Sequence, residues 1–431
     1  MINILNSEKT KKIEAYFFSI LLFELFIGGS GRVISFGFIT LRMILFSIAL
    51  IWFSIRLLVE SKDNFIYRII TAFIALIIIG ATVGYMNNAP KGLIFTDIKQ
   101  LLFFLSIICF SICIKTKEQI DKIIKIIKLS TLILAVTYLI CYMLIKLNII
   151  EMDPFYNMLS AKWLHDEFMF RGTGGNFFYK GFFYLGIGIF FYLFSKPTLK
   201  NGLIAIVIYV ALFLTLLRWL LAITLLVYAG ALFYNWTLNK FKIAFLKSKE
   251  MIFHFTLISI MITIPIIFKN FYITALGNKQ ESVDIRKQQF NEVKSQILIT
   301  ESKTIKTKNS VLNTEKQKIK EKSDFNYFVG KGLGVGVPIR PVHMELTYLE
   351  IFFKQGILGL CFWLFILLYT IFNFRVNSKK HFNTSVPWIT GVLVIYLQSI
   401  TNPLLVNSIG MSFVIMALLI LRIKPINKQE M

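Results

Sequence analysis

The sequence predicts an all-α polytopic membrane protein, and two observations support this fold class. Of its 431 residues, 56% are hydrophobic and only 16% are charged, whereas a soluble domain has about 25% charged residues. The apolar residues form blocks of about 15 to 25 residues, separated by short lysine-rich segments, and a spanning helix needs blocks of this length. A secreted domain, a fibrous protein and a disordered chain are therefore excluded.

The apolar blocks predict about twelve transmembrane helices. They lie at about 15–29, 33–57, 67–85, 99–114, 126–147, 177–195, 203–217, 219–236, 251–268, 344–372, 386–400 and 404–423. Lysine and arginine are concentrated in alternate connections. The positive-inside rule then places both termini in the cytoplasm.

One long polar connection divides the chain into three parts: helices 1–9 in 1–268, a loop in 269–342, and helices 10–12 with a tail in 343–431. The loop is predicted to be extracytoplasmic and to contain an amphipathic helix, because long segments cross the membrane regardless of charge. A shorter outer loop spans about 148–176. Long loops are commonly functional, so we expect any chemistry on the outer face.

The net charge of +24 does not indicate a nucleic-acid partner. The basic residues are scattered between apolar blocks, where they act as topology signals. The two halves of the chain show no convincing repeat, which favours a one-sided enzyme over a transporter.

The entry to the tenth predicted helix contains the sharpest polar pattern. On a helix, His343, Thr347, Glu350 and Lys354 form one stripe, and such a stripe faces protein or water. Pro341 suits the first helical turn, which would place His343 near the positive end of the helix dipole. A neutral imidazole beside an anionic substrate is a candidate general base. The alternative is a histidine that packs at an interfacial helix end.

A second pattern lies in the long loop. Val283, Phe290, Val293 and Ile297 have helical spacing, and Arg286 falls on the same face. An inward arginine needs an anionic partner. The alternative is an arginine that snorkels from an interfacial helix.

Two further arginines are predicted on the outer side. Arg218 is the only charge in an apolar stretch of about 30 residues, which makes it a site candidate. Its alternative role is interfacial anchoring with Trp219. Arg171 precedes flexible glycines whose amides could approach an oxygen-rich ligand. With Arg286 and His343, these arginines would form an external cluster suited to phosphate.

Two other features have structural interpretations. The glycines at 330, 332, 334 and 336 predict a turn of close backbone approach that leads into the tenth helix. Glu24 and Arg42 lie inside the first two predicted helices, where we expect them to pair with each other.

These features together resemble the O-antigen polymerase and O-antigen ligase superfamily. The resemblance is concentrated in Arg218, in the SxxxR segment from Ser282 to Arg286, and in 330–360, where a GxGxG turn precedes His343, Tyr-Leu-Glu-Ile and Gln-Gly-Ile-Leu-Gly. The helix count and the loop placement extend it over most of the chain.

The resemblance implies a metal-independent, inverting glycosyltransferase of lipopolysaccharide biosynthesis with a GT-C-like membrane fold and no cofactor. Donor and acceptor would be glycans on undecaprenyl pyrophosphate at the periplasmic face of the bacterial inner membrane, with a chain-length regulator protein as a further partner. By the same resemblance, Arg218 and Arg286 bind the pyrophosphate, His343 activates the acceptor hydroxyl, and Arg171 and Glu345 assist. The family often has Asn soon after the His, whereas this chain has Met344 and Glu345, which puts the acceptor side in doubt.

Three functions stay open at this point. We favour an O-antigen polymerase, because the family's polymerases are divergent and this chain matches only the degenerate core motifs. An O-antigen ligase, which transfers the glycan to lipid A core, is the first alternative. A polysaccharide flippase or other transporter is the second, since it would also have about twelve helices and intramembrane charges.

Overall fold

The computed structural model describes residues 7–29, 31, 33–36, 39–60, 63–158, 167–170, 176–239, 248–268, 280–298 and 325–423. Within these residues, seven helices are long and apolar enough to cross a membrane. They are Leu41–Val59, Asn64–Met86, Lys91–Cys113, Lys117–Lys146, Arg218–Leu238, Lys249–Ile267 and Thr347–Ser378. Three shorter apolar helices accompany them, at Lys180–Leu193, Leu199–Leu214 and Ser408–Arg422. The protein is therefore a mostly helical, multi-pass membrane protein, and the count of twelve spans stays a prediction.

The chain folds as two compact units. Unit 1 comprises Met1–Thr71, Gln100–Asn278 and Leu364–Met431, and unit 2 comprises Ala72–Lys99 and Lys279–Trp363. Helices α4 (Asn64–Met86), α5 (Lys91–Leu101) and α16 (Thr347–Gln398) contribute residues to both units.

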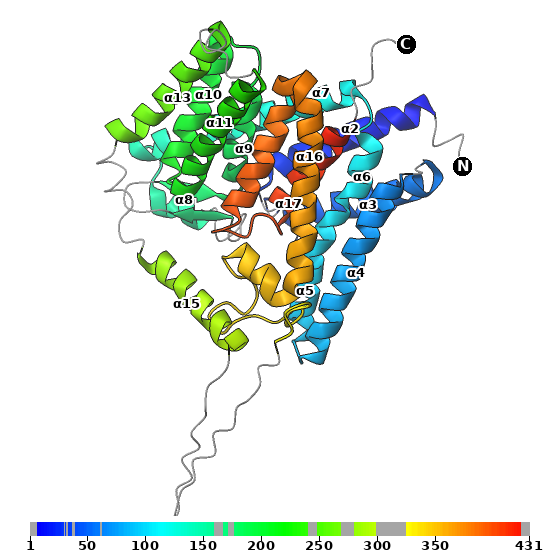
Figure 1. Ribbon diagram of the computed structural model, residues 1–431. Coiled ribbons are helices and arrows are strands. Elements are labelled where there is room, and N and C mark those ends of the chain that lie inside the picture. Colours follow the sequence, from blue (N-terminus) through cyan, green and yellow to red (C-terminus); the bar gives the residue numbers. More distant parts are fainter. Residues whose placement is uncertain are drawn as a thin grey trace, which may run out of the picture. The chain divides into compact units, whose positions relative to one another are not determined.

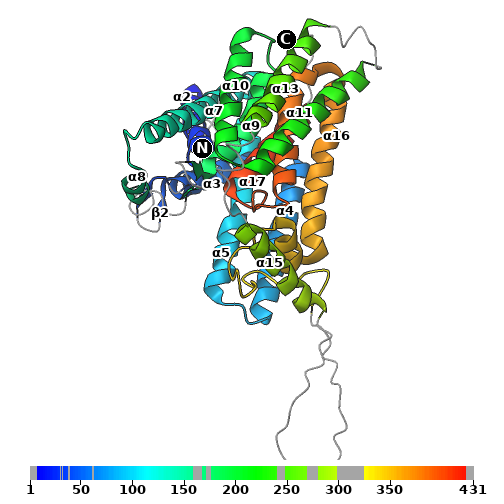
Figure 2. The ribbon, with the colours of Figure 1, turned by 90° about the vertical axis from the view of Figure 1, so that its left-hand side faces the viewer.

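Unit 1 is a helical bundle with two short hairpins. Its helices pack in neighbouring pairs, including α9 with α10 and α2 with α7, and α9, α10, α11 and α13 run side by side (Figures 1 and 2). The helices that lie wholly in unit 1 are α2 (Glu8–Ile27), α3 (Leu41–Glu60), α6 (Ser106–Cys113), α7 (Lys117–Lys146), α8 (Met152–Met158), α9 (Phe183–Leu193), α10 (Leu199–Leu214), α11 (Arg218–Leu238), α13 (Lys249–Ile267) and α17 (Ser408–Arg422), with the 3₁₀ turns η1 (Leu102–Leu105) and η3 (Lys180–Phe182). The hairpins pair β1 (Ser35–Phe36) with β2 (Ile39–Thr40) and β3 (Phe168–Phe170) with β4 (Phe177–Tyr179).

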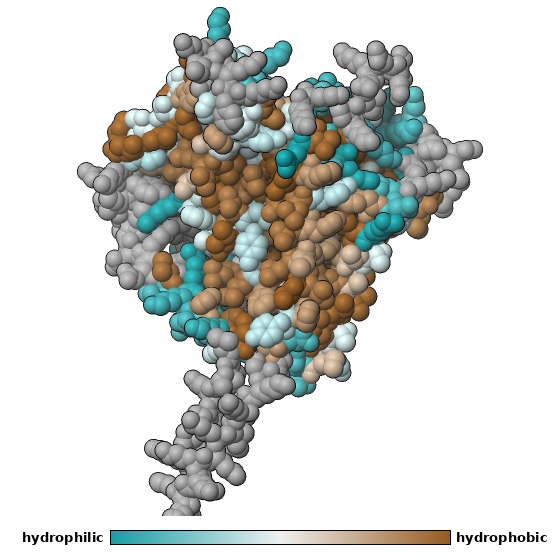
Figure 3. All heavy atoms as spheres, in the orientation of Figure 1, coloured by the Kyte–Doolittle hydropathy of each residue, from teal (hydrophilic) through white to brown (hydrophobic). Residues whose placement is uncertain are grey.

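Helices α2, α7, α10, α13 and α17 begin at a residue whose side chain caps the first turn, and apolar side chains remain on the outer faces of the bundle. At the start of α7, Thr116 and Gln119 form a capping box, which satisfies amides that a helix end leaves unpaired. Large apolar side chains such as Leu58 in α3 and Leu226 in α11 are mostly exposed, and Figure 3 shows how much of the surface over the helices is hydrophobic. Such faces suit lipid rather than water.

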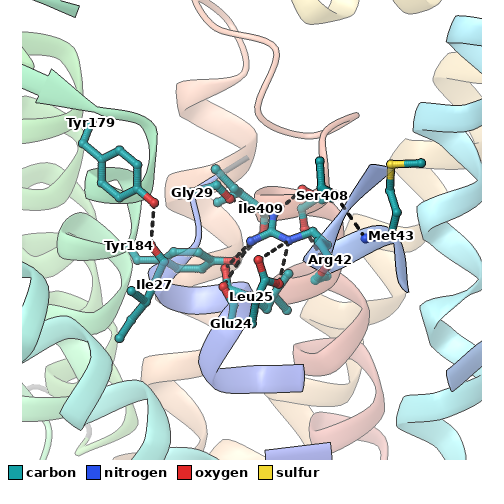
Figure 4. Close-up of polar contacts among 12 residues, drawn as sticks. Glu24, Leu25, Ile27, Gly29, Arg42, Met43, Tyr179, Tyr184, Ser408 and Ile409 are labelled. Carbon is teal, nitrogen blue, oxygen red and sulfur yellow. Dashed lines mark hydrogen bonds and ion pairs between the residues drawn. The ribbon is translucent and has the colours of Figure 1, made fainter. Parts of the chain in front are cut away.

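A buried ion pair in unit 1 confirms the predicted pairing of Glu24 with Arg42. Arg42 Nε lies 2.9 Å from Glu24 Oε2, and the guanidinium also reaches Gly29 O at 2.7 Å and Ser408 Oγ at 2.8 Å. Figure 4 shows Arg42 between the ends of α2 and α17. Because each acceptor comes from a different segment, Arg42 anchors α2, α3 and α17 to one another.

Unit 2 contains helix α15 (Gln280–Leu298), the 325–346 segment and the start of α16. Its core consists of the buried side chains Val293, Phe325, Val337, Met344 and Phe353. Figures 1 and 2 show α15 beside the yellow 325–346 segment. The core therefore holds α15 and the 325–346 segment against the first turns of α16.

The glycine-rich turn makes the close backbone approach that the sequence predicts. Gly330, Gly332 and Gly334 have φ values of 72°, 90° and 81°, a region that side chains disfavour. A Cβ on Gly332 would overlap the backbone of Gly84, and Leu333 N donates to Gly80 O at 2.8 Å. Only glycine lets the turn lie this close to α4.

Helix α16 covers two predicted spans. They were expected at 344–372 and 386–400; the apolar stretch Thr347–Ser378 corresponds to the first, and the helical backbone assigned from Thr347 to Gln398 contains both. The linking residues 373–385 contain no glycine and no proline, so no residue in that stretch breaks a helix.

The backbone pattern of α16 changes at one point, Gly356. This residue has a φ of 63°. Around it, Phe353 O accepts from Lys331 N at 2.7 Å, and Ile357 N donates to Tyr327 O at 2.9 Å. The glycine-rich turn thus supplies the hydrogen bonds that the helix lacks at this point.

Candidate functional site

His343 lies in the segment before α16 rather than on that helix. The helix begins at Thr347, so the expectation of a helical stripe that starts at His343, with Pro341 in the first turn, is wrong. Residues 341–346 are irregular rather than helical, and the glycine-rich turn before them is bonded to α16, as in Gly332 N to Lys354 O at 3.0 Å. The packing of this turn on α16 decides where the helix begins.

His343 nevertheless meets the two charged residues of the predicted stripe. Its Nδ1 lies 3.4 Å from Glu350 Oε1, and Glu350 Oε1 accepts from Lys354 Nζ at 2.8 Å. Asp97 of α5 completes the group, because its Oδ1 lies 2.9 Å from Lys354 Nζ and 3.7 Å from His343 Nδ1. We call these four residues the inner cluster.

The inner cluster determines which ring nitrogen of His343 can accept a proton. Both neighbours of Nδ1 are carboxylate oxygens, which can only accept hydrogen bonds when ionised. Nδ1 therefore carries the proton, and Nε2 of the neutral ring has a free electron pair. The His343 side chain is 36% exposed, whereas those of Asp97 and Glu350 are buried. An outside molecule can thus reach His343 but not its two acidic neighbours.

Asp97, His343 and Glu350 also form a set of donors that could hold a metal ion, since their ligand atoms lie within 4.8 Å of one another. The ammonium group of Lys354 bonds the same two oxygens, Asp97 Oδ1 and Glu350 Oε1. A divalent cation beside them would be repelled by Lys354. The residues therefore fit an internal ammonium better than a metal ion.

A second charged group lies in the same unit and involves Arg286. Arg286 Nε lies 2.9 Å from Glu345 Oε2, and Arg340 Nη2 lies 3.1 Å from Glu345 Oε1. The backbone N–H of Glu345 also donates to Gln289 Oε1 at 3.1 Å. We call Arg286, Arg340 and Glu345 the outer triad, which has a formal charge of +1 from two arginines and one glutamate. The inward arginine thus has the anionic partner that the sequence required.

Helix α15 forms as predicted, but its buried face differs from the expectation. Val283 is 60% and Phe290 52% exposed, while Val293 and Gln289 are buried. The buried face therefore runs through Gln289 and Val293, with the half-buried Arg286 one turn before them. Tertiary packing rotates the helix in this way because the Arg286–Glu345 pair and the Gln289 bond face the same segment.

Arg218 is the first residue of α11 and belongs to unit 1. It follows a strained turn in which Leu216 has a φ of 58°, a value that is unusual for a bulky residue. The neighbouring Trp219 donates from Nε1 to Leu397 O at 3.2 Å. A cation at a helix N-terminus is opposed by the helix dipole, so an anion bound there would be favourable. Arg171 lies outside the described residues.

Sequence reasoning missed two residues of this site. Asp97 is an acidic residue inside an apolar span, and such a residue is a site candidate by default. Arg340 lies three residues before His343 and could have been identified by that proximity. Lys354 was placed on the stripe with Glu350, but its bonds to Asp97 and to the Val342 carbonyl became evident only in the fold.

Comparison with known proteins completes the description of the chain. No family model matches it. The chain is 26% identical over 412 residues to the O-antigen polymerase of Shigella flexneri, and the aligned region covers 92% of each chain. The resemblance that the motifs indicated is confirmed: this chain is similar to an O-antigen polymerase over nearly its whole length.

Proposed function

We propose that this protein is an O-antigen polymerase, an inverting glycosyltransferase that joins undecaprenyl-pyrophosphate-linked repeat units. It would act at the periplasmic face of the bacterial inner membrane, with both termini in the cytoplasm and a GT-C-like fold. The observation that supports the chemistry best is His343, whose Nδ1 faces two carboxylates while part of the ring is exposed. The full-length similarity supports the reaction class.

In the proposed reaction, a hydroxyl of the acceptor sugar attacks C1 of the donor sugar. His343 Nε2 takes the hydroxyl proton as the new C–O bond forms, and the bond between C1 and the phosphate oxygen breaks. Glu350 accepts a hydrogen bond from Nδ1 and stabilises the resulting imidazolium, as the carboxylate does in a catalytic histidine–carboxylate pair. The undecaprenyl pyrophosphate leaves with the bonding electrons, and attack from the opposite face inverts C1.

The arginines would stabilise the negative charge of the leaving group. Arg286 and Arg340 are two guanidinium groups held near one carboxylate, and guanidinium groups bind phosphate oxygens well. We propose that Glu345 accepts the hydrogen bonds of Arg286 Nε and Arg340 Nη2 in the free protein, and that the pyrophosphate replaces Glu345 when the substrate binds. By the family resemblance, Arg218, at the N-terminus of α11 in unit 1, and Arg171 are also proposed as substrate-binding residues.

The reaction as proposed needs neither a metal ion nor another cofactor. The arginines supply the positive charge that a metal would otherwise provide. Lys354 supports this view, because its ammonium already bonds the carboxylates of the only described set of donors for a metal.

The test is a lipopolysaccharide gel from a strain that lacks the gene, complemented with wild type, His343→Ala, Arg286→Ala or a control. His381→Ala is the control for the histidine, because His381 is an exposed histidine on α16. Lys287→Ala is the control for the arginine, because Lys287 is an exposed cation next to Arg286 on α15. We expect core with a single repeat unit for the two site variants and a normal ladder for the two controls. Membrane insertion of every variant is checked by immunoblot.

Other results would support other functions. Bare core with accumulated lipid-linked polymer would indicate a ligase, and bare core without external polymer would indicate a transporter. A normal ladder from His343→Ala would show that His343 is not the base. A chain-length regulator protein is proposed as a partner, and its loss should alter ladder length without abolishing polymerisation.

A further inference from the structure

Lys354 uses its whole hydrogen-bonding capacity inside the protein. Its Nζ donates to Asp97 Oδ1 at 2.9 Å, to Glu350 Oε1 at 2.8 Å and to Val342 O at 2.7 Å. An ammonium group has three N–H bonds, so all are accounted for. The side chain is also buried. Lys354 therefore has no donor left for a substrate, and any effect it has on the reaction must pass through its neighbours.

The acceptors of Lys354 lie next to His343, and two of them restrain it directly. The Val342 carbonyl belongs to the residue immediately before His343, so this bond restrains the backbone that carries the ring. The Glu350 carboxylate is the group that faces His343 Nδ1. One ammonium thus restrains both the main chain of His343 and the acceptor for its ring.

Asp97 extends this restraint to the glycine-rich turn. Its Oδ2 accepts from Gly334 N at 2.7 Å, while its Oδ1 accepts from Lys354. Gly334 has a φ of 81° and lies against Ile94, which is on the same helix, α5, as Asp97. A Cβ on Gly334 would be too close to Ile94. Asp97 therefore holds the turn near α5 and joins it to the residues around His343.

We propose that Lys354 and Asp97 are a positioning pair that fixes the orientation of His343 during glycosyl transfer. This inference rests on the proposed function. Neither residue touches the substrate in this scheme. A small displacement of a reacting group can lower a rate about 100-fold, so a buried pair that restrains both the backbone and the ring partner of His343 is expected to control the rate of the chemical step.

The experiment measures steady-state kinetics of the full-length protein in nanodiscs. The substrate is the undecaprenyl-pyrophosphate-linked repeat unit purified from the strain that lacks the gene. For Lys354→Met we expect kcat to fall about 10- to 100-fold and KM to stay within about 2-fold, because the outer triad is intact. For Asp97→Asn, which keeps the side-chain shape, we expect a smaller loss of kcat and again an unchanged KM. Lys354→Arg, which keeps a cation, should recover part of the rate.

Asp63→Asn is the matched control. Asp63 is also a carboxylate paired with a cation, Arg422, but both residues belong to unit 1, whereas the inner cluster belongs to unit 2. The kcat of Asp63→Asn should therefore equal that of wild type. Wild-type kcat in Lys354→Met or Asp97→Asn would overturn the inference, as would a KM that rises as much as kcat falls. If Lys354→Met fails to fold, Asp97→Asn and Lys354→Arg decide by the same criteria.

The two proposals can fail separately. If His343→Ala retains full activity, the assignment of the base in the proposed function is wrong. If His343→Ala is inactive while folded Lys354→Met and Asp97→Asn keep the wild-type kcat, only the positioning role is wrong.

Discussion

Two arginine–glutamate pairs, one in each unit, have the same closest distance and very different surroundings. Arg42 Nε to Glu24 Oε2 and Arg286 Nε to Glu345 Oε2 both measure 2.9 Å. The Arg42 side chain is 4% exposed, whereas that of Arg286 is 30% exposed. The distance within a pair therefore does not distinguish a structural pair from one that a ligand can approach.

The remaining donors of each arginine make the distinction. The Nη groups of Arg42 donate to Gly29 O, Ser408 Oγ, Glu24 O and Leu25 O, so the whole guanidinium is engaged (Figure 4). Within the described residues, Arg286 uses only Nε, in its bond to Glu345. An arginine with unused donors at a partly exposed position can bind an anion, and one with all donors engaged in a buried site cannot.

The largest effect should come from breaking the buried pair. Arg42→Ala leaves the mostly buried Glu24 carboxylate without its partner, and removing one partner of a buried pair costs about 3–5 kcal/mol. We expect a strong loss of folded protein, measured by size-exclusion chromatography and thermal melting in detergent. The double variant Arg42→Met/Glu24→Leu removes both charges and should recover most of that stability. A wild-type melting temperature for Arg42→Ala would show that the pair is not an anchor.

A smaller effect is expected from the exposed pair, and on binding rather than on folding. Glu345→Gln removes the carboxylate that competes with the pyrophosphate for Arg286 and Arg340. Partly exposed pairs are worth about 1 kcal/mol or less, so the KM for the lipid-linked donor should fall by up to about 5-fold. The melting temperature should change little.

The control for this variant is Glu118→Gln, which removes an exposed glutamate paired with Lys122 in unit 1 and should leave KM unchanged. If Glu345→Gln instead abolishes kcat without lowering KM, Glu345 takes part in catalysis, as the family resemblance implied, rather than competing with the substrate.

The smallest effect concerns Asp63 and Arg422, a pair in unit 1 that is at least as exposed as Arg286 and Glu345. The hydrogen bond and charge of Arg422 lower the pKa of Asp63 below its ordinary value of 3.8. The pair therefore stabilises the folded state above pH 3.8, and this contribution is lost as pH falls through the lowered pKa. Asp63→Asn should cost about 0.5 kcal/mol at neutral pH, since the pair is partly exposed to solvent.

Thermal melting in detergent across acidic and neutral pH checks this prediction. The melting temperature of Asp63→Asn should lie about 1–2 °C below that of wild type at neutral pH, and the two should converge in acid. A difference that persists or grows in acid would show that the carboxylate charge is not the source of the stability.

Part of the site could be predicted because its signals are local in the sequence. Arg286 is a cation on a helix with apolar spacing, and Glu24 and Arg42 are charges within apolar blocks; each needs a partner of opposite charge. The helical spacing of Glu350 and Lys354 likewise predicted their contact. The rotation of α15 could not be predicted, because Val283 and Phe290 fit the apolar pattern as well as Val293 does.

The sequence by itself determined the class of the protein, most helix positions, the close approach at the glycine-rich turn and the need of Arg286 for an anion. Only the tertiary structure decided that this anion is Glu345, that α16 begins after His343, and that Asp97 bonds Lys354 across 257 positions of the chain. The physical reason is that hydropathy and backbone preference act between near neighbours. Ion pairs and hydrogen bonds depend on which distant residues the packed helices bring within about 3 Å of each other.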